Sequence, residues 1–206
     1  MNAMSSENRK YELKARAEKQ AETRRRIVEA TSALHEEVGP ARTTVAEIAR
    51  RAGVQRLTVY NNFPSETELF DACGQHWMER NPPPDPYVAL AIDNPSERLR
   101  AILGPLYRWY RKNARPIENL QRDRLSMPAL DAVMRIHMDQ QFTNLADTLA
   151  SGLAHKGRQA KGMRAAVALA LDYWTWRRLA GEGMSDDAAA ALMLGAVEAA
   201  AESGPR

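Results

Sequence analysis

Six polar or charged side chains lie close together near the end of the N-terminal third, and together they could bond to a nucleic acid. They are Gln55, Arg56, Thr58, Tyr60, Asn61 and Asn62. Amide and guanidinium groups can bond to base edges, and hydroxyl and phenol groups can bond to phosphates. Val54, Val59 and Phe63 are interleaved with them at a helical spacing. A helix here would bury its apolar side chains and point the polar groups outward.

The preceding residues predict a second short helix and a turn that would position this polar face. Thr44 and Glu47 have the spacing of a capping box, in which the threonine hydroxyl accepts from the N–H of Glu47 and the carboxylate reaches back. Gly53 follows, where a tight turn needs an open backbone angle. Two short helices, about 45–52 and 55–62, around a glycine are typical of a helix-turn-helix that reads DNA.

The composition indicates a folded, all-α protein. The chain has 206 residues, 44% hydrophobic and 27% charged, with few β-branched runs. These proportions are ordinary for a chain that buries a core. The net charge of +3 is uneven, because residues 1–63 hold 12 Lys/Arg and 8 Asp/Glu, while the remaining residues hold 17 and 18. The basic excess lies with the helix-turn-helix, where it favours attraction to phosphates.

The cysteine content and the N-terminus indicate a cellular compartment. Cys73 is the single cysteine, which rules out an intramolecular disulfide and fits a reducing environment. The charged N-terminus lacks the apolar core of a signal peptide. No segment approaches the roughly 18 apolar residues that a membrane span needs. We therefore expect a cytoplasmic protein with no membrane association.

Helical periodicity predicts about nine helices in three regions. A charged extension covers residues 1–20 and either frays or continues the first helix, a helix-turn-helix domain covers 21–65, and a helical core covers 66–206. The expected helices cover about residues 22–38, 45–52, 55–62, 66–80, a stretch that begins at 95, 117–124, 128–153, 161–180 and 186–202.

Prolines and capping residues predict where several helices begin and end. Pro64 ends the second short helix, and Ser65 with Glu68 predicts another capping box. The Pro-rich run 81–86 cannot be helical and makes a stiff connection. Asn94 is the expected N-cap of the helix that follows.

Two later helices have apolar patterns that predict how they pack. In helix 128–153, the expected buried face carries Leu130, Val133, Met134, His137, Gln141, Leu145 and Leu149. Helix 161–180 is apolar nearly all round, so both of its sides must be covered. One side can pack on its own domain, and the other suits a partner chain.

The chain resembles the TetR family (tetracycline-repressor-like) of bacterial transcription regulators. The matching elements are Arg26-Ile27, Thr44, Ile48-Ala49, Ala52-Gly53-Val54, Thr58, Tyr60, Phe63-Pro64-Ser65 and Leu69. The resemblance implies a homodimer formed through the last two helices, 161–180 and 186–202. It also implies a palindromic operator in double-stranded DNA, and a helical pocket whose small-molecule effector weakens DNA binding.

The resemblance further implies which residues contact DNA. They are Thr44, Gln55, Arg56, Thr58, Tyr60, Asn61 and Asn62. Arg56 could read guanine or hold a phosphate, and Gln55 could read a base edge. Thr44 and Tyr60 would anchor phosphates. Three positions depart from the family, because serine is common at Gln55, histidine at Asn62 and lysine at Glu66. We therefore expect a weaker N-cap on helix 55–62, which we call the reader helix, and one phosphate contact fewer.

Aromatic and polar residues of the C-terminal region are candidates for the effector pocket. They are Leu106, Trp109, Tyr110, Arg122, Met134, His137 and Trp174. Together they would suit an apolar or aromatic compound, and Arg122 could select an anion. Each also has a plainer interpretation: core packing for the apolar residues, a satisfied core histidine for His137 and a surface salt bridge for Arg122.

Basic residues at the N-terminus have two open interpretations. The run Arg24-Arg25-Arg26 could hold phosphates or form a solvated helix end. The N-terminal extension could reach into a minor groove or be disordered.

The sequence contains nothing that resembles a nucleophile–base pair, a phosphate-binding loop or a metal cluster. Cys73 and His76 have a spacing that allows a metal pair, but core packing is the better interpretation without further ligands. We therefore expect no catalytic residue, no metal and no cofactor. The main hypothesis is a ligand-responsive DNA-binding repressor. The alternatives are a repressor without a small-molecule ligand, and a helical enzyme with a hairpin that imitates a helix-turn-helix.

Overall fold

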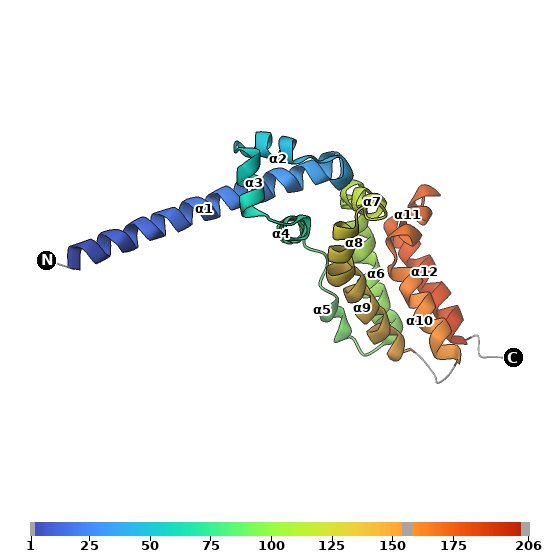
Figure 1. Ribbon diagram of the computed structural model, residues 1–206. Coiled ribbons are helices and arrows are strands. Elements are labelled where there is room, and N and C mark those ends of the chain that lie inside the picture. The colour runs from blue at the N-terminus through green and yellow to red at the C-terminus, as the bar shows by residue number, and fades with distance from the viewer. Residues whose placement is uncertain (1–2, 154–157, 203–206) are drawn as a thin grey trace. The chain divides into compact units, whose positions relative to one another are not determined.

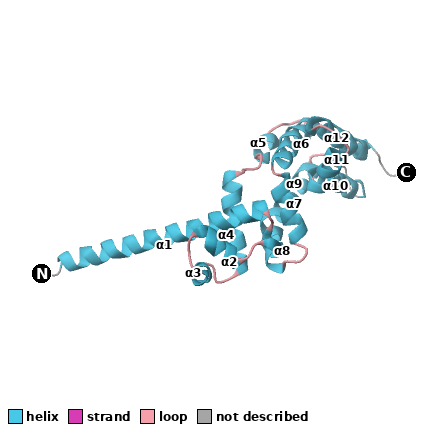
Figure 2. Ribbon diagram, turned by 90° about the horizontal axis from the view of Figure 1, so that it is seen from above, coloured by secondary structure: helices cyan, strands magenta, loops and turns pink. Residues whose placement is uncertain are grey.

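The computed structural model describes residues 3–153 and 158–202, and every regular element in these ranges is helical (Figures 1 and 2). The prediction of an all-α fold is therefore confirmed. The chain forms two compact units. Unit 1 comprises Met1–Arg80 and Glu118–Val133, and unit 2 comprises Asn81–Ile117 and Met134–Arg206. Within the described ranges, no helix combines the length and the apolar character needed to cross a bilayer.

Unit 1 is built around one long helix. Helix α1 runs from Ala3–Glu37 without a break, so the described part of the N-terminal extension continues the first helix. A 3-10 turn, Pro40–Arg42, leads to α2 (Val45–Ala52) and α3 (Arg56–Asn62), and α4 (Glu66–Arg80) follows. Helices α2 and α4 pack on α1, and α3 packs on α2. The buried core includes Ile27, Leu34, Ile48, Val59, Phe63 and Cys73.

The predicted helix starts of unit 1 are confirmed in part. The Thr44 hydroxyl accepts from the N–H of Glu47 at 3.2 Å, and the Ser65 hydroxyl accepts from the N–H of Glu68 at the same distance. The return bond expected from the Glu47 carboxylate is replaced, because its two oxygens accept from Arg50 at 2.9 and 2.5 Å. Both predicted hydroxyl bonds are therefore present, and the Glu47 carboxylate bonds to Arg50 instead of reaching back to Thr44.

Unit 2 is a layered bundle of helices. The short α5 (Pro86–Leu90) packs on α6 (Pro95–Lys112), which continues through Pro105 and packs on α12 (Asp186–Glu202). Helix α10 (Arg158–Leu171) packs on α9 (Gln140–Ser151) and on α12. Helix α7 (Ala114–Asp123) begins in unit 2 and ends in unit 1.

The prediction of a single helix over residues 128–153 was wrong. The chain forms α8 (Pro128–Met134), a π-helical turn over Arg135–Asp139 and then α9. A π-helical turn takes up more residues than an α-helical turn, so it rotates the positions that follow relative to those before it.

This rotation corrects the predicted buried face after Met134. His137 and Gln141 were expected to face inward, but both are exposed. Met138 and Phe142 are half-buried in their place, and Leu149 is buried as expected. His137 is therefore not a core histidine.

The prediction of a single helix over residues 161–180 was also wrong, because the chain breaks at Asp172. This residue has an extended backbone, and its carboxylate accepts from the N–H groups of Trp174 and Thr175 at 2.9 and 3.1 Å. It thus caps a new helix, α11 (Tyr173–Gly181). An aspartate N-cap satisfies backbone donors that a continuous helix would bond internally.

Candidate nucleic-acid interface

The turn between α2 and α3 fixes how the two helices cross. Gly53 has a left-handed backbone, with φ of 64° and ψ of 41°. Its N–H donates to the carbonyl of Arg50 at 3.3 Å, and the N–H of Val54 donates to the carbonyl of Ala49 at 2.9 Å. This pair of bonds is a Schellman motif, which satisfies carbonyls at the end of α2. The prediction of an open backbone angle at Gly53 is therefore confirmed.

Two arginine side chains of α1 bond to the C-terminal ends of α2 and α3. The Arg26 guanidinium donates to the carbonyl of Ala52, and to that of Gly53 at 2.9 Å. Arg24 donates to the carbonyl of Asn62 at 2.5 Å, and its guanidinium lies 3.9 Å from the centre of the Phe63 ring. These side chains bind the last carbonyls of α2 and α3, whereas only phosphates or solvent were predicted as partners for this arginine run.

The polar face of α3 is open to solvent. Gln55, Arg56 and Asn61 are exposed, and Tyr60 is 55% exposed. On the opposite side, Val59 is buried. The structure thus places most of the predicted DNA-contacting side chains on one accessible surface. Thr44, at the start of α2, is also exposed.

Two predicted contact residues are less accessible. Thr58 and Asn62 are half-buried, and the Asn62 amide donates to the carbonyl of Thr58 at 2.8 Å. Leu57, which was not among the predicted contacts, is 65% exposed between Arg56 and Thr58. An exposed leucine on a polar face can contact a thymine methyl group.

Gln55, where serine is common in the tetR family, changes how α3 begins. Gln55 occupies the N-cap position of α3 with extended backbone angles, and its side chain makes no capping bond. A serine hydroxyl would bond the free N–H groups of the first turn. The amide of Gln55 therefore remains exposed at the start of the reader helix, where it is available to a base edge.

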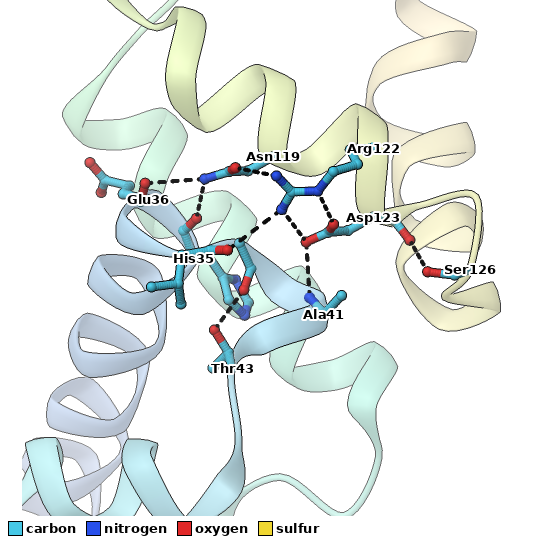
Figure 3. A network of polar contacts seen from close by, with 10 residues as sticks. His35, Glu36, Ala41, Thr43, Asn119, Arg122, Asp123 and Ser126 are labelled. Carbon is cyan, nitrogen blue, oxygen red and sulfur yellow. Dashed lines mark hydrogen bonds and ion pairs between the residues drawn. The ribbon is translucent and has the colours of Figure 1, made fainter.

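A polar network in unit 1 joins the end of α7 to the turn between α1 and α2 (Figure 3). The Asp123 carboxylate accepts from the N–H of Ala41 at 2.9 Å and from Arg122 at 2.7 Å. The Asn119 amide donates to the carbonyls of His35 and Glu36 at 3.3 and 3.2 Å. Nothing in the sequence signalled this network, because its two sides are more than 80 residues apart.

Burial and hydrogen bonding together set the charge states in this network. It lowers the pKa of His35 to about 4, although the nearby Asp123 charge acts in the opposite direction. Burial would raise the pKa of Asp123, but the bonds from Arg122 and the N–H of Ala41 outweigh it and lower that pKa. At neutral pH, Asp123 is charged and His35 is neutral.

The seven pocket candidates do not form one group. Arg122 belongs to unit 1, where its guanidinium bonds to Asp123 and Asn119. His137 is exposed, and Trp174 is 50% exposed. The remaining candidates are buried in unit 2: Leu106, Trp109, Tyr110 and Met134.

Aromatic side chains cluster inside unit 2 around Tyr110. Its ring lies 5.3 Å from that of Tyr173 and 5.8 Å from that of Trp176. The hydroxyls of Tyr110 and Tyr107 donate to the carbonyls of Leu171 and Ala170 at 2.7 and 2.8 Å. Tyr107 was not predicted as a member of this cluster, although an i, i+3 spacing from Tyr110 places the two on neighbouring faces of α6.

No cluster of three or more metal-binding side chains occurs in the ranges that the structure describes. Cys73 is packed in the core of unit 1, with its sulfur 3.9 Å from the carbonyl oxygen of Val28. Burial raises the pKa of its thiol to about 12. The sulfur is therefore a protonated core group at neutral pH.

Comparisons with known proteins agree with this geometry. Residues 27–73 match the profile of bacterial regulatory proteins of the tetR family. The HTH-type transcriptional repressor KstR of Mycolicibacterium smegmatis is 32% identical over 106 residues, which are 52% of this chain and 52% of that protein. The chain thus aligns with about half the length of this curated relative.

Solved structures share the fold at low sequence identity. A TetR-like transcriptional regulator from Rhodococcus sp. RHA1 is 21% identical, with a TM-score of 0.60, over 88% of this chain and 97% of that one. RolR in complex with the ligand resorcinol is 22% identical, with a TM-score of 0.50, over 92% of this chain and 98% of that one. The segment that matches the tetR-family profile, residues 27–73, includes both helices of the helix-turn-helix at residues 45–62.

Proposed function

We propose that the protein is a homodimeric transcriptional repressor that binds a palindromic operator and is released by a small molecule. The observation that carries the proposal is the exposed polar face of α3, held by the Gly53 turn and by two arginines of α1. KstR is a transcriptional repressor, which supports repression as the direction of regulation.

The proposed DNA contacts divide by chemistry. Arg56 and Gln55 stand at the start of α3 and are exposed, which suits contact with base edges in a major groove. Tyr60 and Thr44 would bond to phosphates and fix the register. Asn61 would join them, while Thr58 and Asn62 would need to turn from their positions in the free protein.

Equilibrium binding to a duplex selected from a random library tests the DNA contacts. Arg56→Ala should weaken binding by about 1–3 kcal/mol and relax the sequence preference. Tyr60→Ala should weaken binding to all sequences alike, because a phosphate contact carries no sequence information. Arg178→Ala and Tyr87→Ala are matched controls, since both side chains are exposed in unit 2. Unchanged affinity and unchanged salt dependence in both reader variants would contradict the proposal.

The proposed dimer forms through exposed apolar faces of α10 and α12. Leu169 is 57% exposed on α10, and Leu192 is 50% exposed on α12. The exposed positions around Leu192 are small and uncharged: Ala188, Ala191, Gly195, Ala196 and Ala199. Contiguous apolar faces on a soluble protein mark interaction sites, and small residues allow close approach of two helices.

Sedimentation velocity tests the proposed dimer face. Leu169→Asp and Leu192→Asp should shift the protein toward monomer, because each buries a carboxylate in the interface. Val88→Asp, at a 76% exposed position on α5, should leave the dimer intact. A wild-type monomer, or dimers in both interface variants, would contradict this part of the proposal.

The proposed effector is an apolar or aromatic compound bound among the aromatic residues of unit 2. Trp109 and Tyr110 are buried on α6, and the Tyr110 ring lies beside those of Tyr173 and Trp176. RolR, which shares the fold, was crystallised with resorcinol. An effector weakens operator binding only if it binds more tightly to a dimer conformation that does not fit the operator than to the one that does, typically by 1–3 kcal/mol of coupling.

A thermal-shift screen followed by DNA binding tests the effector. A compound that binds the folded state should raise the melting temperature and lower operator affinity. Trp109→Leu should abolish both effects while leaving operator affinity in the absence of the compound unchanged. A compound that raises the melting temperature equally in the variant would contradict binding at this cluster.

A repressor without a small-molecule ligand is the second candidate function. The hydroxyls of Tyr107 and Tyr110 already bond to backbone carbonyls of their own unit, as in an ordinary core. Native mass spectrometry of the purified protein discriminates between the two. A co-purified small molecule favours the effector, whereas a bare chain together with a blank thermal-shift screen favours the second candidate.

A further inference from the structure

The N-terminal half of α1 carries a basic stripe along one face. Arg9, Leu13, Arg16, Gln20 and Arg24 recur at intervals of four, three, four and four residues. Because α1 has no break, this spacing keeps the five on one side of the helix. Three of the five are arginines, and none is acidic. We call this set the basic stripe.

The carboxylates of the same segment lie on other faces. Glu18 and Glu22 fall on the side opposite the stripe, and Glu12 falls at its edge. Lys14 forms an ion pair with Glu18 at 3.9 Å, so part of the remaining basic charge is matched within the helix. The stripe therefore carries every arginine of residues 9–24 and no carboxylate, whereas Lys10, Lys14 and Lys19 lie outside it.

The stripe begins at the reader helix and leads away from it. Arg24 donates to the carbonyl of Asn62, the last residue of α3. Arg16 and Arg9 follow on the exposed part of α1, which runs past α3 and α4 with no other helix of unit 1 beside it (Figure 1). A partner that touches α3 is thus positioned to meet the stripe as well.

We propose that the basic stripe binds the phosphate backbone of double-stranded DNA outside the half-site that α3 reads. The proposal rests on the function proposed above and adds a second contact surface to it. A guanidinium suits phosphate because its fork of N–H donors forms paired bonds with the oxygens. An α-helix rises about 1.5 Å per residue, so Arg9 stands roughly 22 Å beyond Arg24.

This reach sets the length of DNA involved. Each base pair adds about 3.4 Å, so the stripe can span at most roughly six base pairs of flanking duplex. Contacts to phosphates carry no sequence information. The stripe should therefore strengthen binding to any flanking sequence without changing the operator preference.

Two matched double variants of the full-length protein test the proposal. Arg9→Gln/Arg16→Gln removes two charges from the stripe, and Lys14→Gln/Lys19→Gln removes two charges from the rest of the same helix segment. Both are measured against the selected operator, once with 12 flanking base pairs on each side and once trimmed to its half-sites. Circular dichroism verifies equal helix content, and Arg9→Lys/Arg16→Lys retains the charge as a rescue.

The stripe variant should lose roughly tenfold in affinity on the long duplex, and its salt slope should fall by about 1.8 per bound protomer. Lys14→Gln/Lys19→Gln should lose much less affinity. Arg9→Lys/Arg16→Lys should keep the salt slope of the wild type. Trimming the duplex should remove the difference in affinity between the two Gln variants. Equal losses in both double variants, or an undiminished loss on the trimmed duplex, would overturn the proposal while leaving the α3 reader intact. Wild-type protein that binds neither duplex would instead overturn the proposed function, and the stripe with it.

Discussion

The helix ends of residues 44–65 in unit 1, which we call the reader segment, have different causes from those of the helices between residues 128 and 181. In the reader segment, helix ends coincide with Thr44, Gly53 and Ser65, whose own chemistry ends or starts a helix. In the later region, the phase of the helices changes at the π turn Arg135–Asp139 and at Asp172. Local capping determines the first region. In the second region Asp172 also caps a helix, but the π turn begins without a capping bond from a side chain.

The turn before α2 in unit 1 and the turn between α11 and α12 in unit 2 differ in how distant residues support them. The turn before α2 is held by Asp123 and Asn119 of α7, and the end of α2 is held by Arg26 of α1. The turn between α11 and α12 is open at Gly183, where an added Cβ would meet no atom within 4 Å. Variants at matched positions can measure how much this distant support contributes.

Gly39→Ala should have the largest effect. Gly39 has φ of 91° and ψ of 158°, a combination that glycine adopts almost alone, and an added Cβ would lie 2.6 Å from the Asp123 carboxylate and still closer to Arg122. We expect a loss of about 4 kcal/mol in the free energy of unfolding, from backbone strain and displaced hydrogen bonds. Gly183→Ala, with φ of 83° in open space, should lose about 1–2 kcal/mol. Equal losses in urea unfolding would show that distant support is unimportant.

Acidification should weaken unit 1 through His35. The unfolded chain binds a proton at His35 near pH 6.5, but the folded chain binds it only near pH 4, because burial lowers the pKa of the ring. The unfolded state therefore binds more protons in this window, so the free energy of unfolding falls as the pH drops from about 6.5 to about 4.

The full shift corresponds to about 3 kcal/mol, and we expect about 2 kcal/mol because the ring is only half-buried. Urea unfolding across this pH range should show the loss, and His35→Gln should flatten it. His137→Gln removes an exposed histidine of unit 2 as a control. A pH dependence that persists unchanged in His35→Gln would contradict the assignment.

Arg26→Gln should lower the free energy of unfolding more than Arg25→Gln, the substitution at the adjacent position. Arg26 donates to carbonyls at the end of α2, whereas Arg25 pairs with Glu22 and Glu29 on the surface of α1. We expect a loss of about 1.5 kcal/mol for Arg26→Gln and less than about 0.5 kcal/mol for Arg25→Gln. Hydrogen exchange of α2 amides should rise in the first variant alone. Equal exchange in both would mean that local caps suffice.

Asp172→Ala should have the smallest effect and tests the later region. Removing an N-cap carboxylate costs about 1 kcal/mol. Asp187→Ala, an 82% exposed partner of Arg108, should lose less than about 0.5 kcal/mol. If packing positions this break, the crystal structure of Asp172→Ala will keep α10 and α11 as separate helices. A fused helix over 158–181 would show that the cap alone makes the break.

Much of unit 1 could be predicted from the sequence because its signals are local. The bounds of α2 and α3, the Gly53 turn and the outward position of Arg56 follow from residues within a few positions of one another. The roles of Arg26 and Asp123 could not be predicted, since each bonds to a segment at least 26 residues away. The exposure of His137 was missed because a π turn has no sequence signal as clear as a proline or glycine.

Dimethyl sulfate protection of the selected operator tests the central proposal most directly. If α3 of each protomer enters a major groove, guanine N7 atoms should be protected in two clusters about 34–36 Å apart. One protected guanine in each cluster should become reactive again with Arg56→Ala. Binding without major-groove protection, or a pattern that Arg56→Ala leaves unchanged, would contradict the assignment of α3 as the reader.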